Sequence, residues 1–187
     1  MTTEFGDGLN QAVHTAFTRP APKSAGAQMR YLVKQLGGTK AVAQMLRVSQ
    51  RTVERYVKDK FKAPRKNLAV RLEREVKARW QPQVRAKARQ KAATTGGLVI
   101  DVHARLGYAG APDSTTDQDR IRHLTVALPP RYAARLFDAQ QRGATEDQLR
   151  ELTADALKEV YFQDGGTRAG SLREVQINDV VHLEFGL

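Results

Sequence analysis

Between Thr39 and Lys58 the chain carries the pattern of two short helices that cross at a tight turn. Such helices can cross only where a small residue separates them, and Ala43 stands at that position. The wedge between them needs apolar side chains, which are supplied by Val42, Leu46, Val48, Val53 and Tyr56. Thr39 and Ser49 belong to the residue types that favour helix N-caps. Together these features predict a helix-turn-helix.

The turn of this motif departs from the usual pattern in one residue. The position that normally holds a left-handed glycine holds Arg47, at a cost of about 1 kcal/mol. The candidate DNA contacts on and just after the second helix are Gln50, Arg51, Thr52, Arg55 and Lys58. In the major groove an arginine can fork onto guanine and a glutamine onto adenine, and each good pair discriminates by roughly 1–3 kcal/mol. The alternative is a generic basic helical hairpin with solvated charges.

Positive charge is concentrated in one part of the chain. The net charge of the 187 residues is +11, but residues 19–95 hold 21 Lys and Arg against 4 Asp and Glu, whereas residues 96–187 hold 10 against 14. A charge of this size favours polyanionic partners, either nucleic acid or an acidic membrane. The asymmetry indicates a nucleic-acid-binding part joined to something else.

A long basic helix is expected after the motif, from Asn67 to Ala93. Apolar residues recur every four positions in its first half and predict a buried stripe: Leu68, Leu72, Val76 and Trp80. Pro82 must kink or break the helix. Beyond Pro82 the apolar face is small, so the basic residues there are candidate phosphate contacts: Arg85, Lys87, Arg89 and Lys91.

The C-terminal half alternates with the period of a β-strand. Residues 98–108 place an apolar residue at every second position, and residues 124–128 form a second alternating run. A helix to about Arg142, a helix with a capping box at Thr145 and Gln148, and a strand-like tail follow. The expected fold is α+β: a flexible N-terminal arm (1–23), a basic all-α helix-turn-helix domain with a long basic helix (24–95), and a small acidic α+β domain (96–187).

The run from His123 through the next two helices resembles a ribbon-helix-helix unit. In that family one strand pairs with its dimer mate, so the resemblance implies a homodimer. Leu124, Val126 and Leu128 would then pack inward, and the outward residues would be Arg122, His123, Thr125 and Ala127. This outward set is poor in base-reading groups, which favours dimerisation over DNA contact. A small domain of strands and helices without a dimer is the alternative.

The sequence does not contain the residue patterns that several classes of functional site require. The chain has no cysteine, and its four histidines form no ligand-spaced pair, so no metal site is expected. No phosphate-binding glycine loop and no Ser/His/Asp arrangement occurs, and the carboxylates are too dispersed for the metal cluster of a nuclease or polymerase. There is also no 18-residue apolar run and no signal pattern. We therefore expect a cytoplasmic protein that is not an enzyme and does not bind a membrane.

Five segments carry a more specific resemblance: Thr18–Arg30, Gly38–Gln44, Val48–Lys58, Ala78–Arg85 and Val160–Gly166. They resemble the telomere terminal proteins (Tpg family) of linear Streptomyces chromosomes and plasmids. The resemblance implies a protein that caps 5′ DNA ends covalently and primes their completion. It further implies telomeric DNA, a DNA polymerase and a telomere-associated protein as partners, and the nucleoid as the location.

In that family a threonine hydroxyl accepts the first deoxynucleotide. The matching positions here are Thr115 and Thr116, between which the sequence does not choose; Ser114 is a weaker candidate. The polymerase would supply the divalent metal and the deoxynucleotide, so no bound cofactor is expected. A second reading is a dimeric transcriptional regulator or plasmid-partition protein, and a third is an RNA-binding or nucleoid-structuring protein.

Overall fold

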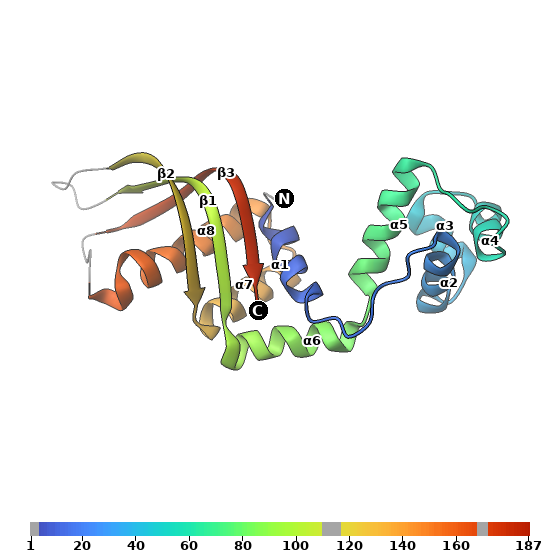
Figure 1. Ribbon diagram of the computed structural model, residues 1–187, viewed down its shortest axis with the longest axis horizontal. Coiled ribbons are helices and arrows are strands. Elements are labelled where there is room, and N and C mark those ends of the chain that lie inside the picture. Colours follow the sequence, from blue (N-terminus) through green and yellow to red (C-terminus); the bar gives the residue numbers. More distant parts are fainter. Residues whose placement is uncertain (1–3, 110–116, 168–171) are drawn as a thin grey trace. The chain divides into compact units, whose positions relative to one another are not determined.

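The computed structural model describes residues 4–109, 117–167 and 172–187, and in them the fold is mixed α+β (Figure 1). The chain divides into two compact units. Residues 18–82 form one, here called the helical unit. Residues 1–17 and 83–187 together form the other, here called the sheet unit. The expected α+β class is therefore confirmed, while the division of the chain differs from the expected one.

The helical unit contains four helices: α2 (Ala25–Leu36), α3 (Thr39–Leu46), α4 (Gln50–Val57) and α5 (Lys66–Arg79). Ser24 caps α2, accepting a hydrogen bond from the Ala27 amide at 3.3 Å, and Gly37 ends it in the left-handed conformation. The apolar faces meet in one core, whose fully enclosed members include Met29, Leu32, Val42, Leu46, Val53 and Leu72. The predicted stripe of α5 therefore packs inward up to Val76.

Trp80 follows this stripe but is only half-buried. Its indole nitrogen donates to the Arg19 carbonyl at 3.0 Å, and its ring lies 4.9 Å from that of Tyr31. The Thr18 amide donates to the Gln81 side chain at 3.0 Å. Trp80 and Gln81 thus hold the segment that precedes α2 in place. A sequence pattern based on one helix face does not reveal these contacts.

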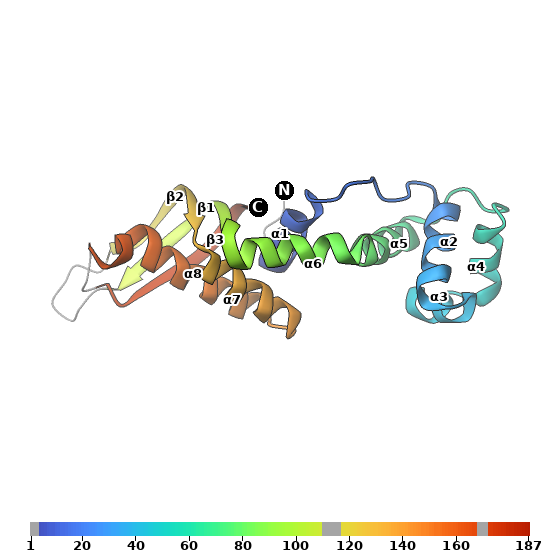
Figure 2. The same cartoon turned by 90° about the horizontal axis from the view of Figure 1, so that it is seen from below.

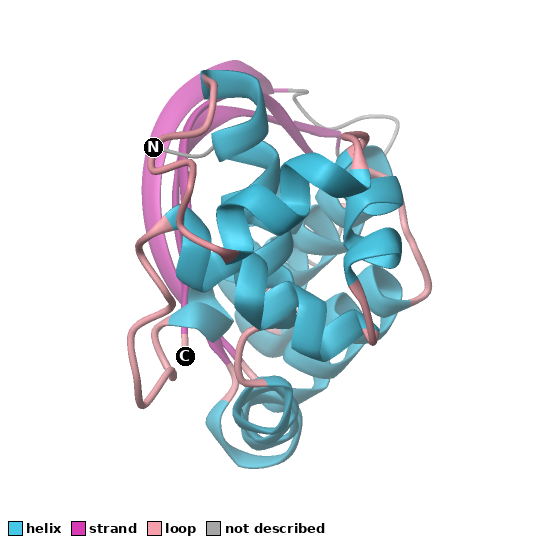
Figure 3. Cartoon of the chain, turned by 90° about the vertical axis from the view of Figure 1, so that its right-hand side faces the viewer, coloured by secondary structure: helices cyan, strands magenta, loops and turns pink. Residues whose placement is uncertain are grey.

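The sheet unit is built on three antiparallel strands in the order β2-β1-β3, which form one curved layer (Figure 3). Their bounds are Leu98–Ala109 (β1), Asp117–Leu128 (β2) and Glu174–Gly186 (β3). The predicted alternation is confirmed from Leu98 to Leu106, because every second residue there is buried: Leu98, Ile100, Val102, Ala104 and Leu106. Leu124, Val126 and Leu128 of β2 are buried as well.

Helices cover this apolar face of the sheet (Figures 1 and 2). They are α7 (Pro130–Gln141), α8 (Glu146–Leu157), which begins with the predicted capping box, and α1 (Phe5–His14). One short turn, Ala92–Gly96 (η1), follows helix α6 (Pro82–Lys91), and two more, Lys158–Phe162 (η2) and Asp164–Gly166 (η3), follow α8. Gly97, between η1 and β1, has φ 74°, and a Cβ there would lie 2.2 Å from the Leu128 carbonyl oxygen. Only glycine fits this close approach without strain.

The interpretation of residues 1–23 as a flexible arm is wrong for α1. Phe5 and Leu9 are buried in the core beneath the sheet. The carboxylate of Glu146, at the start of α8, accepts hydrogen bonds from the Phe5 and Gly6 amides at 2.6 and 3.0 Å. These groups lie 140 residues apart in the chain, so a local pattern could not predict their contact.

The long basic helix is divided by the proline as expected, and its second part, α6 (Pro82–Lys91), belongs with the sheet unit from residue 83 onward. The predicted boundaries at residues 23 and 95 therefore shift to residues 17 and 82. The reason is that α1 and α6 each bury side chains among the groups of the sheet unit, Arg85 being the buried residue of α6. Among the described residues, no helix is long and apolar enough to cross a membrane.

The ribbon-helix-helix arrangement is not confirmed. That family pairs its strand with a dimer mate, but here β2 pairs along its length with β1 of the same chain, for example Val126 with Ile100. A register of this kind makes β2 part of a three-stranded sheet. The inward set Leu124, Val126 and Leu128 is nevertheless correct, and so are the outward His123, Thr125 and Ala127, because alternation fixes them whichever strand the partner is. The outward assignment of Arg122 is wrong, because it stands two residues before Leu124 and shares its face, where it is half-buried and donates to the Tyr108 hydroxyl at 3.1 Å.

Candidate nucleic-acid interface

The candidate interface rests on the packing of α3 against α4. The five predicted wedge residues lie between the helices and the rest of the unit, four of them buried and Val48 partly buried. Ala43 is 5% exposed, as the small residue at the crossing should be. Arg47 adopts the left-handed conformation at φ 52°, which confirms the predicted departure from glycine. This packing fixes one side of α4 and leaves the other side available.

Only one of the two predicted N-caps is present. Ser49 Oγ accepts from the Thr52 amide at 3.2 Å and lies 2.8 Å from the Thr52 hydroxyl. Thr39 is the first helical residue of α3, and Gly38 takes the cap position. The Thr39 hydroxyl instead accepts a hydrogen bond from Gln50 Nε2 at 3.1 Å. Thr39 therefore links the starts of the two helices.

The predicted contact residues share the exposed side of α4, except that Thr52 is half-buried. Arg51 and Lys58 form no hydrogen bond or ion pair through their side chains with any described residue. Gln50 also donates to Glu54 at 2.9 Å, and the Arg55 guanidinium lies 5.3 Å from the centre of the Phe61 ring. Arg51 and Lys58 are thus the contact residues most available for a ligand, and of the two Arg51 lies within α4.

The connection between α4 and α5, together with the first residue of α5, adds positive charge that the sequence interpretation did not single out. Lys60, Lys62, Arg65 and Lys66 are all exposed within nine residues of Lys58. Asp59 is the one acidic residue in this stretch, and its carboxylate is paired with Arg30 at 2.7 Å. A count of basic residues along the sequence could have found this group, because it needs no tertiary information.

The four candidates on α6 separate into two kinds. Arg85 is 8% exposed, donates to Asn10 Oδ1 at 3.1 Å and lies 3.4 Å from His14 Nε2, both on α1. Burial lowers the pKa of the Arg85 guanidinium, and the nearby charge of Arg89 lowers it further. A buried side chain cannot reach a phosphate, so the prediction of Arg85 as a DNA contact is wrong.

Arg89 is half-buried, and burial lowers its pKa too. Its guanidinium lies 5.7 Å from the centre of the Phe137 ring on α7. Lys87 and Lys91 are exposed, and their side chains form no hydrogen bond or ion pair with the described residues. They remain candidate phosphate contacts, in a different unit from α4.

The candidate priming residues Thr115 and Thr116, with Ser114, lie outside the described residues. They belong to the segment that connects the end of β1 at Ala109 to the start of β2 at Asp117.

The structure brings together a row of histidines that the sequence interpretation treated as scattered. His123, His103 and His182 are direct neighbours across β2, β1 and β3. His123 Nε2 donates to Asp101 Oδ1 at 2.9 Å, and the Thr125 hydroxyl donates to Asp101 Oδ2 at 2.6 Å. These hydrogen bonds, from Thr125 first and then His123, hold the pKa of the Asp101 carboxyl below its usual value near 3.8.

The row lies on the sheet face opposite the helices. His182 Nε2 is 3.5 Å from Asp101 Oδ1, and the rings of His103 and His123 are centred 5.7 Å apart. Within residues 4–109, 117–167 and 172–187, no group of three or more side chains is arranged to hold a metal ion. The signal available in the sequence was the outward position of Asp101 and His103, but their partners depend on strand register.

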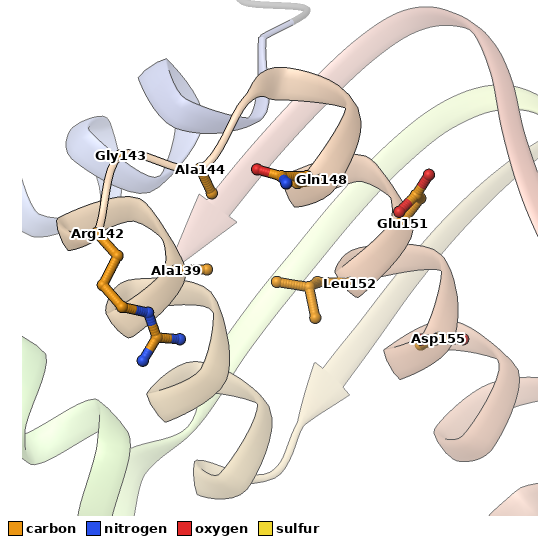
Figure 4. Close-up of a pocket in the computed structure, with 8 residues that line it drawn as sticks. All are labelled: Ala139, Arg142, Gly143, Ala144, Gln148, Glu151, Leu152 and Asp155. Carbon is orange, nitrogen blue, oxygen red and sulfur yellow. The ribbon is translucent and has the colours of Figure 1, made fainter.

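One pocket of about 430 Å³ lies between α7 and α8 (Figure 4). It is lined by Ala139, Arg142, Gly143, Ala144, Gln148, Glu151, Leu152 and Asp155. Ala139 and Leu152 face each other across it. None of the residues predicted to bind DNA or to accept a nucleotide lines this pocket.

Comparison with known proteins gives no relative from which a role for these residues could be taken. No family model, no curated protein and no solved structure matches the chain.

Proposed function

We propose that this chain binds DNA, with α3 and α4 acting as a helix-turn-helix and α4 entering the major groove. The observation that carries the proposal is the state of Arg51, an exposed side chain without a partner among the described residues, on a short helix whose opposite side is buried. An α-helix fits the width of the major groove, and an arginine there can make two hydrogen bonds to guanine.

The charge of the helical unit supports the same function. Residues 18–82 contain 17 Lys and Arg against 4 Asp and Glu. Phosphate contacts by such residues release counterions from DNA and supply much of the binding free energy. The exposed lysines and arginines between α4 and α5 follow directly on the reading helix, so they are suited to contact the backbone beside the bases that α4 reads.

We further propose that the DNA is a chromosome or plasmid end and that the chain is a protein primer. The support is the sequence resemblance to telomere terminal proteins. In the proposed step the hydroxyl oxygen of Thr115 or Thr116 attacks the α-phosphate of a deoxynucleoside triphosphate. The new O–P bond forms as the bond to pyrophosphate breaks, and the hydroxyl proton goes to solvent. A DNA polymerase catalyses the transfer with its own divalent metal ions, so the chain needs no base of its own.

DNA binding is tested by comparing Arg51→Ala with Lys34→Ala, a change at another exposed residue of the helical unit that removes the same charge. Fluorescence anisotropy with a panel of duplexes, including telomeric ends, is measured at several salt concentrations. Arg51→Ala should weaken binding to the preferred sequence about 5- to 150-fold, which corresponds to the loss of one bidentate base contact. Lys34→Ala should have at most a small effect. Equal effects of the two changes would contradict base reading by α4.

Priming is tested by incubating the chain with a labelled deoxynucleotide, magnesium, telomeric template and an extract that contains polymerase. Protein that retains label after nuclease digestion supports a covalent link. Loss of label in Thr115→Ala, Thr116→Ala or the double variant identifies the acceptor, and normal labelling of all three refutes the assignment. A regulator would instead protect a palindromic duplex and take no label, and a nucleoid-structuring protein would bind without sequence preference.

A further inference from the structure

An aromatic ring is exposed directly beside the proposed reading helix. Phe61, in the connection between α4 and α5, is 38% exposed, and its neighbours Lys60 and Lys62 are both exposed. Phe61 is not a member of the helical-unit core, whereas Tyr56, beneath it, is buried. Phe61 therefore presents an exposed ring between two exposed lysines on the surface of the helical unit.

The backbone that carries Phe61 is fixed by contacts on both sides of it. The Lys60 amide donates to the Arg55 carbonyl at 2.8 Å, and the Tyr56 hydroxyl donates to the Ala63 carbonyl at 3.4 Å. Asp59 is in the left-handed conformation at φ 54° and is paired with Arg30, which also donates to the Val57 carbonyl at 2.8 Å.

The approach of this connection to α2 requires a glycine. A Cβ at Gly26 would lie 2.0 Å from Asp59 Oδ1 and 3.0 Å from the Tyr56 carbonyl oxygen. The distance to Tyr56 involves backbone, which cannot move aside as a flexible side chain can. The connection is therefore held against α2 at Asp59, two residues before Phe61.

The ring itself is also fixed in orientation. Its centre lies 5.4 Å from that of Tyr56 in an edge-on arrangement, and the Arg55 guanidinium lies 5.3 Å from it. Edge-on aromatic pairs and cation–π contacts restrict how a ring can turn. Phe61 is thus an oriented aromatic surface with a cation beside it and a lysine on each side in the chain.

We propose that Phe61 stacks on an unpaired base of the nucleic acid bound at α4, which makes a single-stranded or frayed segment part of the ligand. This rests on the proposed function, because it takes α4 as the DNA contact. Bases inside an intact duplex are stacked on both sides, so away from the duplex ends an unpaired base offers its face to a side chain and a paired base does not. Arg55 lies beside the ring, and the exposed Lys60 and Lys62 adjoin Phe61 in the chain, so positive charge is available for the phosphates that flank the base. A protein partner fits less well, because lysine is depleted in protein–protein interfaces.

The test compares three fluorescein-labelled probes: a blunt duplex, the same duplex with a single-stranded extension, and the single strand alone. Phe61→Ala removes no charge, so its effect on affinity reports the ring. We expect it to weaken binding to the two probes with unpaired bases about 5- to 150-fold, the effect of losing one stacked base. Binding to the blunt duplex should change less than about twofold, and the salt dependence should not change.

Two further variants separate stacking from structure. Phe61→Leu keeps an apolar side chain against Tyr56 but has no aromatic face, so it should show the same selective loss, whereas Phe61→Trp should retain binding. Val70→Ala is the matched control, since Val70 is 60% exposed on α5 of the same unit. It should leave all three affinities unchanged.

Equal losses on the blunt duplex and on the probes with unpaired bases would overturn the proposal, and so would unchanged affinities for all three. Unchanged affinities would leave a protein partner as the ligand of the ring. The proposed function fails in a different way, by weak or absent binding of the unmodified chain to every probe or by no effect of Arg51→Ala on any of them.

Discussion

Replacing Arg85 by methionine should change the stability of the chain, whereas replacing Lys87 by methionine should change only its binding to DNA. The two residues are two positions apart on α6 and have the same charge. The Arg85 guanidinium is enclosed between α6 and α1, where it donates to Asn10 at 3.1 Å and lies 3.4 Å from His14. A hydrogen bond to a charged group contributes about 1.5–3 kcal/mol net. Methionine replaces most of the apolar stem, so Arg85→Met should lower the free energy of unfolding of the sheet unit by about 2–3 kcal/mol.

The assay uses urea titrations followed by far-ultraviolet circular dichroism and by tryptophan fluorescence. The chain has a single tryptophan, Trp80, which lies in the helical unit. Fluorescence therefore reports the helical unit, and circular dichroism reports both units. The Arg85→Met circular dichroism transition should move to lower urea, while the fluorescence transition should move less. DNA affinity, measured where the variant is folded, should be unchanged.

Lys87→Met should leave both transitions in place, because the Lys87 side chain is exposed and forms no hydrogen bond or ion pair within the described residues. If Lys87 contacts a phosphate, the slope of the logarithm of the DNA affinity against the logarithm of salt concentration should fall by about 0.9. Unchanged stability of Arg85→Met together with weakened DNA binding would refute the reasoning, since it would mean that the guanidinium reaches DNA.

Three other changes give separate tests. Ser49→Ala should lower the stability of the helical unit by about 1 kcal/mol, measured by Trp80 fluorescence in urea, and Ser49→Asp should restore most of it because aspartate also caps helices. Because the pKa of Asp101 is lowered in the fold, its carboxylate stabilises the folded state above the usual pKa near 3.8. This contribution is lost as the pH falls through the folded-state pKa. The Asp101→Asn variant should therefore lose less stability than the unmodified chain between about pH 5 and pH 2. Gly97→Ala should destabilise the sheet unit by at least about 1–3 kcal/mol in thermal unfolding, because the new Cβ meets backbone at a positive φ; wild-type stability would contradict that close approach.

Local patterns in the sequence predicted the elements of the candidate interface well. The spacing of apolar residues identified the packing of α3 on α4, and the Ser49 cap and the left-handed Arg47 occur where the sequence predicts them. These features depend on neighbours within a few residues, so residue type and period are sufficient. The same holds for the inward and outward faces of β1 and for the interruption of the basic helix at Pro82.

The environment of Phe61 could not be predicted from local patterns. Its type and its lysine neighbours are readable in the sequence, but its exposure and the contacts that orient it are not. They depend on Asp59 reaching Arg30 and on the close approach to Gly26, which are about thirty residues away in the chain. A side chain in a connection has no period from which its environment could be predicted.

Residue type and period were sufficient to predict the α+β class, the helices and strands, and the concentration of positive charge in the middle of the chain. Which charges are available to a ligand depends on how the chain folds. Arg85 is enclosed by α1, a helix that the sequence interpretation assigned to a flexible arm, while Lys87 two residues later is exposed. Strand register likewise decided that His103, His123 and His182 are neighbours. Burial and register arise from contacts between segments far apart in the chain, and composition and period carry no information about which segments meet.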